Sequence, residues 1–362
     1  MQIAEIAVGT VRVPLRHPFV TALRRVTHVE DLVVRLTTSD GVVGFGEAPP
    51  TPQITGETLA SIRGAWEFLA PRLSGVAFDE PSTVVDELEA AMVHNTSAKA
   101  ALDMALYDVW GKTLGQPVWR LLGGTVPRLQ TDITISIGGR EQMAHDSVEA
   151  VERGFRILKV KVGTGDDMAR LRAVREAVGP NIVIRVDANQ GWGADEAIAI
   201  IRTIEEAGID VELVEQPVAG HDLAGLGRVT RAVDTPILAD EAAFSVDDAR
   251  RILDEGAADL VNIKLMKSGG ITGARRIAAL ADKAGVACMI GSMLETKLAV
   301  NAASHVAVAC PSVTMVDLDG PLLCASDPVI GGAIFDGPSI TLDDSPGLGV
   351  TGIEGVEWTV LS

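Results

Sequence analysis

Two lysines interrupt an apolar run that otherwise has the pattern of a buried strand. Lys159 and Lys161 stand at alternate positions of ILKVKVG, residues 157–163, and alternate side chains of a strand point to the same face. Lysine is almost never fully buried without a partner, because removing an ammonium group from water is costly. The run therefore predicts a buried group of opposite charge that faces these two lysines.

Acidic and amide side chains end several other apolar runs of the chain. Asp187 and Asn189 end one run, Glu215 ends the next, and Asp240 and Glu241 end a third. A single aspartate at such a place often only caps the following helix. Three carboxylates on consecutive strands, however, require a compensating cation. Since no Cys or His stands at these positions, we expect a hard divalent ion such as Mg²⁺ rather than zinc.

A third lysine, Lys264, ends the run DLVNIKLM. Lys161 and Lys264 would then approach the carboxylates from opposite sides, where burial and neighbouring positive charge lower the pKa of a lysine and make a free amine accessible. The alternative is that these lysines only form internal salt bridges. Two bases around a metal suit proton abstraction from the carbon next to a carboxylate, provided that the metal stabilises the resulting enediolate.

The elements that position these residues alternate along the chain from about Thr131 onward. Apolar runs alternate with amphipathic helical stretches, which predicts parallel strands with right-handed crossovers, and eight such units are the number that closes a TIM barrel. An open doubly wound sheet is the alternative. The eight runs are DITISIG, ILKVKVG, IVIRVDAN, VELVEQP, PILADE, DLVNIKLM, ACMIGSM and TMVDLDG.

The N-terminal part of the chain has a different pattern. β-Branched and alternating runs with hairpin-turn residues at Ser39-Asp40-Gly41 predict antiparallel sheet, and helical stretches follow in 55–73 and 97–115. We therefore expect an α+β domain over 1–125. A catalytic barrel over 126–319 and a segment over 320–362 that returns to the first domain complete the predicted organisation.

Composition and charge exclude several classes of protein. The net charge of −18 and the absence of a basic block argue against nucleic-acid binding. No apolar run is long enough for a membrane span, and no targeting segment is recognisable at the N-terminus. A cytoplasmic protein is expected. The three cysteines, Cys288, Cys310 and Cys324, have no metal or redox spacing and are predicted to be reduced core residues.

Five motifs together resemble the muconate-lactonising-enzyme subgroup of the enolase superfamily. They are KVK at 159–161, VDANQGW at 186–192, VEQP at 214–217, ADE at 239–241 and NIKLMKSGG at 262–270. The resemblance implies an N-terminal α+β capping domain with a loop near 16–30 that determines substrate specificity, a modified (β/α)₈ TIM barrel and a homo-oligomer. It also implies one Mg²⁺ per subunit, bound by Asp187, Glu215 and Asp240, with Lys161 and Lys264 as the acid/base pair. Mandelate-racemase-like relatives would place a His in the seventh run, which has none.

The eighth run bears on the substrate. Asp317 and Asp319 in VDLDG stand at alternate positions, which predicts one inward face. Two carboxylates there would repel a dianionic muconate and pair with an ammonium group. The alternative is a helix cap and a buried pair with an arginine. We expect a dipeptide, epimerised at the α-carbon of its C-terminal residue by two-base 1,1-proton transfer through an enediolate.

The Asp-x-Asp pair, TDITISIG and MIGSMLET resemble the dipeptide epimerases. That resemblance implies substrate-binding residues Thr134, Lys159, Ser292, Met293, Asp317 and Asp319, and Arg24 resembles the residue that binds the glutamate side chain in Ala-Glu epimerases. Arg25 leaves that assignment open, and hydrophobic or cationic dipeptides remain alternatives. So do N-acylamino-acid racemase, o-succinylbenzoate synthase and cycloisomerase activities. A non-catalytic barrel that binds a metal or metabolite is the alternative from another class, but it has no need for two opposed lysines.

Overall fold

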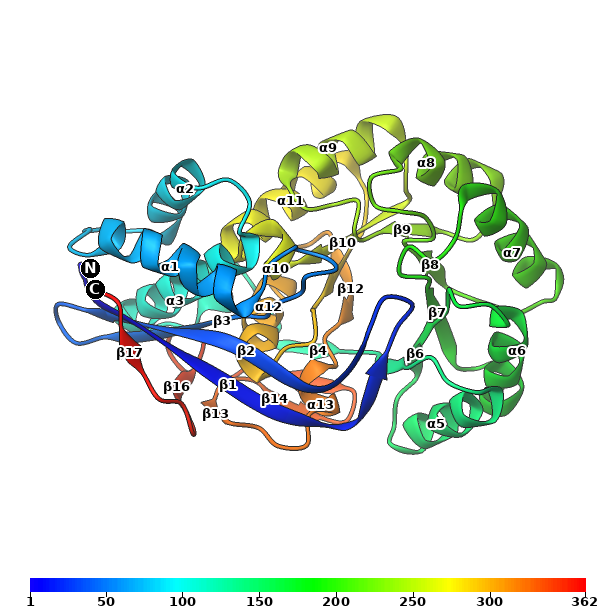
Figure 1. Cartoon of the computed structure of the whole chain (residues 1–362), viewed down its shortest axis with the longest axis horizontal. Coiled ribbons are helices and arrows are strands. Elements are labelled where there is room, and N and C mark those ends of the chain that lie inside the picture. The colour runs from blue at the N-terminus through cyan, green and yellow to red at the C-terminus, as the bar shows by residue number, and fades with distance from the viewer.

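An antiparallel sheet and three helices form the N-terminal domain; the sheet and two of the helices were predicted, and the helix between those two was not. In the computed structural model, which describes all residues from Met1 to Ser362, β1 (Ile3–Val20), β2 (Arg25–Thr38) and β3 (Val43–Ala48) are consecutive in this sheet. Strand β17 (Thr359–Val360), near the C-terminus, pairs with β1. The helices α1 (Leu59–Leu73), α2 (Pro81–Ala91) and α3 (Thr96–Leu114) share an apolar core with the sheet (Figure 1).

Helix α3 lies unusually close to the sheet because β3 contains two glycines. A Cβ atom at Gly46 would lie 1.9 Å from the carbonyl oxygen of Ala101, and one at Gly44 would lie 2.3 Å from that of Ala105. Only glycine permits this approach. The close approach of α3 follows directly from the sequence VGFGEA of β3.

Eight parallel strands form the barrel and lie in the order of the chain. Each hydrogen-bonds to the next, which agrees with the predicted barrel and excludes the doubly wound order. The strands are β5 (Ile133–Ile135), β6 (Ile157–Lys161), β7 (Val183–Asp187), β8 (Leu213–Glu215), β9 (Ile237–Ala239), β10 (Leu260–Lys264), β11 (Cys288–Gly291) and β12 (Val313–Asp317). The helices between them are α5 (Arg140–Glu152), α6 (Asp167–Val178), α7 (Ala194–Glu206), α8 (Leu223–Ala232), α9 (Val246–Glu255), α10 (Leu265–Ser268), α11 (Ile271–Ala284) and α12 (Lys297–Ala307).

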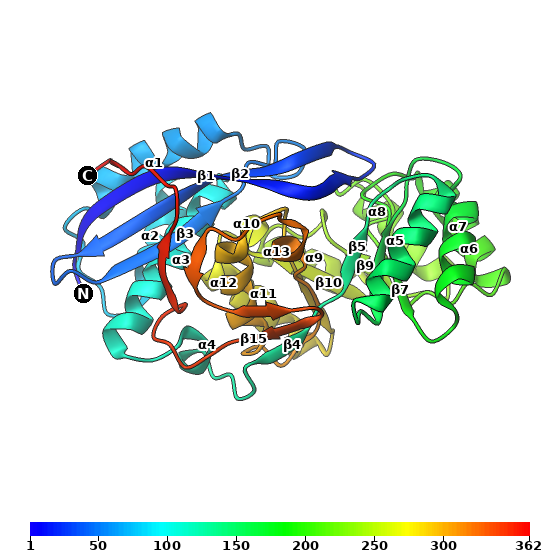
Figure 2. The same cartoon turned by 90° about the horizontal axis from the view of Figure 1, so that it is seen from below.

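Side chains rather than a backbone ladder close the barrel between β12 and β5. The sheet ends at these two strands. Across this seam the amide of Leu318 donates to Thr131 Oγ1 at 2.9 Å, and the amide of Thr134 donates to Asp319 Oδ2 at 2.6 Å. Asp319 therefore helps to close the barrel. Figure 2 shows β1 and β2 extending from the N-terminal domain toward the barrel.

Short elements connect the barrel to the first domain. They are α4 (Val118–Leu121), α13 (Gly320–Leu323), the pair β13 (Val329–Gly331) and β16 (Val350–Ile353), and the sheet of β4 (Arg128–Gln130), β14 (Ile334–Asp336) and β15 (Ser339–Thr341).

Buried carboxylates of the N-terminal domain bind the amino ends of two barrel helices. Glu47 of β3 accepts hydrogen bonds from the amides of Thr296 and Ala299 at the start of α12, both at 2.9 Å. Asp103 of α3 accepts from the amides of Ile271 and Thr272 at the start of α11. The first amides of a helix lack intrahelical partners and favour negative charge. These contacts fix how the N-terminal domain lies on the barrel.

The segment predicted as a loop near 16–30 is instead mainly β-hairpin. Strands β1 and β2 continue to Val20 and from Arg25, so only the tip between them is irregular. The tip reaches the barrel, where Val20 exchanges hydrogen bonds with Ser136 and Ile137 after β5 (Figure 1). Backbone pairing between β1 and β2 makes this segment a stiff hairpin, and the hairpin rather than a free loop carries the tip to the barrel.

No helix in the structure combines the length and the apolar character that crossing a membrane would require.

The three cysteines are free thiols. Cys288 and Cys324 are buried, as predicted, and Cys310 is only partly buried.

Candidate active site

The strand register aligns the charged residues at one end of the barrel. Lys161, Asp187 and Glu215 are direct neighbours at the ends of β6, β7 and β8. Lys264 and Asp317 flank Gly291 in the same way at the ends of β10, β11 and β12. The carboxyl ends of barrel strands carry the functional residues of TIM-barrel enzymes. The structure thus brings the predicted catalytic and metal-binding side chains to one barrel mouth.

Lys159 is surrounded by three carboxylates. Its Nζ lies 2.6 Å from Glu215 Oε2, 2.7 Å from Asp317 Oδ2 and 3.1 Å from Asp187 Oδ2, and the side chain is 1% exposed. The buried negative charge that the sequence of β6 required is therefore present. Through these three contacts Lys159 of β6 links β7 and β8 to β12.

The other buried lysines of the mouth pair with Asp187 and Asp240. Lys161 Nζ lies 2.5 Å from Asp187 Oδ2, and Lys264 Nζ lies 2.8 Å from Asp240 Oδ2. Lys267, which the sequence reading did not single out, holds the second oxygen of Asp240, with Nζ 2.5 Å from Oδ1. Each catalytic candidate is thus paired with one carboxylate of a predicted metal ligand.

Negative charge exceeds positive charge in this cluster. Six buried carboxylates and four buried ammonium groups gather at the mouth, which leaves a net charge of −2 when all are ionised. The carboxylates belong to Asp187, Glu215, Asp240, Glu241, Asp317 and Asp319, and the ammonium groups to Lys159, Lys161, Lys264 and Lys267. Burying uncompensated charge is costly, so the cluster favours either bound protons or a cation.

The carboxylates respond to their surroundings in two ways. Burial alone would raise the pKa of Asp187 and of Asp240, but the ammonium groups of Lys161 and Lys264, respectively, outweigh it and lower both values. Burial and the neighbouring Asp187 raise the pKa of Glu215 to about 7. Burial and Asp240 raise the pKa of Glu241 to about 8. Burial and the neighbouring Asp317 raise the pKa of Asp319 to about 6. Three of the six carboxylates therefore have raised pKa values, which reflects the excess of negative charge.

The expectation of a lowered pKa is wrong for Lys264. Burial by itself lowers the pKa of Lys159 and of Lys264, but the surrounding carboxylates outweigh it and raise both values. The physical reason is that each of these two ammonium groups contacts carboxylates directly. Lys161 and Lys264 do form internal salt bridges, as the alternative expected, but both also border a cavity at the barrel mouth.

We expected the three carboxylates to converge on one common point, and in the structure they do not. No three acidic, histidine or cysteine groups are arranged around a single cation position, because the Lys159 ammonium lies between Asp187 and Glu215. The donor set nevertheless suits Mg²⁺, which prefers oxygen ligands. Both carboxylate oxygens of Glu241 and Oδ1 of Asn189 are buried without a hydrogen-bond donor. Together with the excess negative charge, these oxygens fit a divalent ion.

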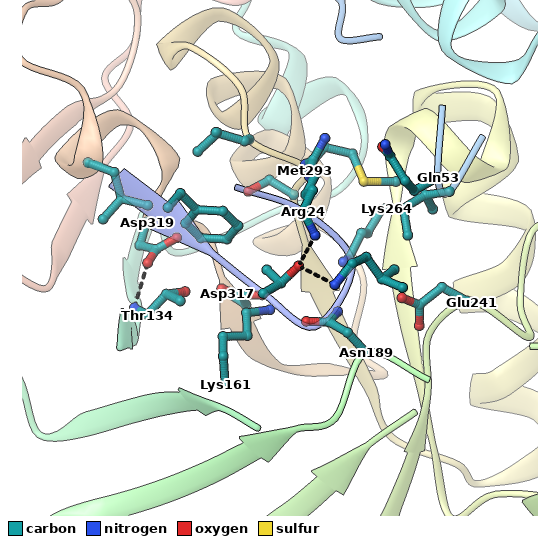
Figure 3. Close-up of a pocket in the computed structure, with 17 residues that line it drawn as sticks. Arg24, Gln53, Thr134, Lys161, Asn189, Glu241, Lys264, Met293, Asp317 and Asp319 are labelled. Carbon is teal, nitrogen blue, oxygen red and sulfur yellow. Dashed lines mark hydrogen bonds between the residues drawn. The ribbon is translucent and has the colours of Figure 1, made fainter. Parts of the chain in front are cut away.

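The cavity above the cluster is lined by most of the predicted substrate-binding residues. Thr134, Ser292, Met293, Asp317, Asp319 and Arg24 border it together with Lys161 and Lys264 (Figure 3). Lys159 does not border the cavity. Arg24 is partly buried at the hairpin tip and lines the cavity, whereas Arg25 is exposed and does not.

The two aspartates of the VDLDG run differ in position, contrary to the expectation of one strand face. Strand β12 ends at Asp317, and Asp319 has helical backbone angles before α13. Asp319 Oδ2 accepts from the Thr134 amide (Figure 3), whereas Asp317 pairs with Lys159. The buried Arg185 pairs with Asp132 and Glu212 instead, so an arginine pair for Asp317 and Asp319 is excluded. Both aspartates still line the cavity.

Several residues at the site were not assigned a role from the sequence. Asn262 donates to Glu215 Oε1 at 2.9 Å and alternates with Lys264 on β10, so its position could have been read from the strand period. Gly291 leaves room for Lys264, because a Cβ there would lie 3.1 Å from Lys264 Cε. Gln53 and Ile54 follow β3 and line the cavity without any local sequence signal.

Replacing Lys159 with methionine should destabilise the metal-free protein. Three buried carboxylates would lose their shared ammonium group, and breaking a buried ion pair costs about 3 to 5 kcal/mol. Urea unfolding in the presence of a chelator measures this change, with the exposed Lys283→Met as the control. Equal stability of Lys159→Met and the unmodified protein would show that the lysine does not balance these carboxylates.

Comparisons with known proteins agree with this geometry. Residues 3–123 match the mandelate racemase / muconate lactonizing enzyme N-terminal domain, and residues 142–355 match the enolase C-terminal domain-like family. An L-Ala-D/L-Glu epimerase of Clostridium acetobutylicum is 47% identical over 98% of this chain and 99% of that protein. One of Bacillus subtilis is 46% identical over 97% of both chains.

Solved structures of relatives superpose closely. The substrate-liganded L-Ala-D/L-Glu epimerase of Bacillus subtilis has a TM-score of 0.96 at 45% identity and covers 98% of this chain and 99% of its own. A dipeptide epimerase of Enterococcus faecalis, in complex with Mg and L-Leu-L-Tyr, has a TM-score of 0.93 at 38% identity and covers 97% and 100%. Both domain matches and these relatives establish that the chain belongs to the mandelate racemase / muconate lactonizing enzyme family of the enolase superfamily.

Proposed function

We propose that the chain is a Mg²⁺-dependent dipeptide epimerase that inverts the α-carbon of the C-terminal residue. The observation that carries this proposal is that Lys161 of β6 and Lys264 of β10 line one cavity, while three predicted metal ligands lie on or directly after the strands between them. Two amines can reach opposite faces of a carbon bound there. A binding barrel without catalysis would not need both.

Asp187, Glu215 and Asp240 would hold one Mg²⁺ ion per chain. When bound, the ion supplies positive charge that stabilises the enediolate of the substrate carboxylate. One lysine accepts the α-proton as a free amine, and the other donates a proton to the opposite face as an ammonium group. Relatives of Enterococcus faecalis and Cytophaga hutchinsonii have been solved with Mg and a dipeptide, which supports the same metal here.

Asp317 and Asp319 would bind the substrate ammonium group. Both line the cavity near Thr134, and burial is outweighed by Lys159 so that the pKa of Asp317 is lowered to about 2. Asp317 is therefore an anion at neutral pH. Ser292 and Met293, after β11, line the same cavity, and the Ser292 amide donates to the Asp317 carbonyl at 3.1 Å. Lys159 supports this wall through Asp317.

Arg24 would bind a glutamate side chain at the epimerised residue. It is the arginine of the hairpin tip that lines the cavity, and burial lowers the pKa of its guanidinium group. The relatives that are 46–47% identical are L-Ala-D/L-Glu epimerases, which supports L-Ala-L-Glu as the substrate. A hydrophobic dipeptide, as the name of a 39% identical relative states for that protein, is the second candidate.

Replacing either Lys161 or Lys264 with alanine should abolish epimerisation. Each variant lacks the group that serves one face of the α-carbon, so one variant should still exchange the α-proton of a single enantiomer. Mass spectrometry of L-Ala-L-Glu and L-Ala-D-Glu incubated in D₂O measures this exchange, with exposed Lys283→Ala as the control. Native rates of epimerisation in either active-site variant would refute the two-base mechanism.

The native enzyme should discriminate against N-acetylated dipeptides, which lack the ammonium group. Charge-assisted hydrogen bonds contribute about 1.5 to 3 kcal/mol, so the double variant Asp317→Asn/Asp319→Asn should raise KM for free dipeptides by at least about tenfold. We would compare kcat/KM for a free and an acetylated dipeptide on both proteins. Equal kcat/KM for both forms on the native enzyme would favour an N-acylamino-acid racemase instead.

Arg24→Ala should raise KM for L-Ala-L-Glu by about tenfold or more, since a lost charge-assisted hydrogen bond costs at least about 1.5 kcal/mol. It should change KM for L-Ala-L-Leu little. The neighbouring exposed Arg25→Ala is the matched control and should change neither. If Arg24→Ala and Arg25→Ala behave alike, the glutamate preference would be wrong while the dipeptide assignment could stand.

A further inference from the structure

Lys267 is a buried lysine that the proposed mechanism does not use. It lies on the short helix α10, three residues after Lys264, and its side chain is fully buried. It is not among the residues that line the substrate cavity. A buried ammonium group needs a specific set of partners, so its contacts indicate what it does.

All three donors of the Lys267 ammonium are directed at two residues. Nζ donates to Asp240 Oδ1 at 2.5 Å, to the Asp240 carbonyl oxygen, and to the Asn262 carbonyl oxygen at 3.0 Å. The Asp240 amide is held from the other side by Gln216 Oε1 at 2.9 Å. The backbone and one carboxylate oxygen of Asp240 are therefore fixed, and Lys267 has no donor left for a substrate.

The two oxygens of Asp240 consequently have different surroundings. Oδ1 is occupied by Lys267, whereas Oδ2 lies 2.8 Å from the ammonium of Lys264, which borders the cavity. Oδ2 is therefore the oxygen whose partner borders the cavity, whereas the partner of Oδ1 does not. If Asp240 binds a cation there, it does so through one oxygen.

We propose that Lys267 is a positioning residue that restricts Asp240 to one ligating oxygen and thereby makes the site selective for Mg²⁺ over Ca²⁺. Mg²⁺ requires near-octahedral geometry and short bonds, whereas Ca²⁺ accepts more ligands and bidentate carboxylates. An aspartate with both oxygens free would suit Ca²⁺ better than the aspartate present here. This inference rests on the proposed metal site of Asp187, Glu215 and Asp240.

The test is the ratio of the Ca²⁺ and Mg²⁺ dissociation constants, measured by calorimetry on metal-free protein without substrate. Lys267→Met removes the ammonium group at similar volume. Loss of this positive charge strengthens the binding of both ions. The ratio of the two dissociation constants therefore reports only the effect of freeing the second oxygen of Asp240. We expect the dissociation constant for Ca²⁺ divided by that for Mg²⁺ to fall by about tenfold or more, which corresponds to about 1.4 kcal/mol in favour of Ca²⁺. The exposed Lys283→Met is the matched control and should leave the ratio unchanged.

An unchanged ratio in folded Lys267→Met would overturn the inference and leave Lys267 as a structural link between β9 and β10. If Lys267→Met does not fold, Lys267→Ala, which also removes every donor to Asp240 Oδ1, should lower the ratio in the same direction by about threefold or more. An unchanged ratio in that variant would overturn the inference equally. Absence of Mg²⁺ binding by the unmodified protein would instead refute the proposed metal site, so the two failures are distinguishable.

Discussion

The buried charge at the mouth of the barrel is the constraint on which the rest of the structure depends. Carboxylates from β7, β8, β9 and β12 surround the ammonium groups of β6, β10 and α10 with almost no exposure to water. Such a cluster is stable only when each charge has a partner. Lys159 satisfies this requirement for three strands at once. The same requirement leaves an excess of negative charge, which a divalent cation could neutralise.

The architecture serves this cluster in two ways. The barrel register brings the charged strand ends level with one another, and Gly291 keeps the space into which Lys264 extends. The N-terminal domain then covers the mouth with a hairpin whose tip carries Arg24. Glu47 and Asp103 attach that domain to the helices α12 and α11. Residues of the hairpin can therefore vary the substrate while the charge cluster stays the same.

Strand ends were predictable from the sequence because burial leaves a strong pattern. A lysine within an apolar run is rare, so ILKVKVG predicted buried negative charge. In the structure Lys159 contacts the buried carboxylate of Glu215. Features that depend on which strands meet were not predictable. Asp319 closes the seam between β12 and β5, and Lys267 reaches Asp240 of a neighbouring strand. The expected lowering of the pKa failed for Lys264 for a similar reason, because its ammonium group contacts the Asp240 carboxylate directly.

Calorimetric titration of the metal-free chain with Mg²⁺ tests the central claim most directly. If the cluster is completed by a divalent cation, one ion should bind per chain, and binding should be lost or greatly weakened in Asp187→Asn. The exposed Asp282→Asn of α11 removes the same charge far from the cluster and should bind as the unmodified chain does. Failure of the unmodified chain to bind Mg²⁺, or equal binding by Asp187→Asn, would contradict the account.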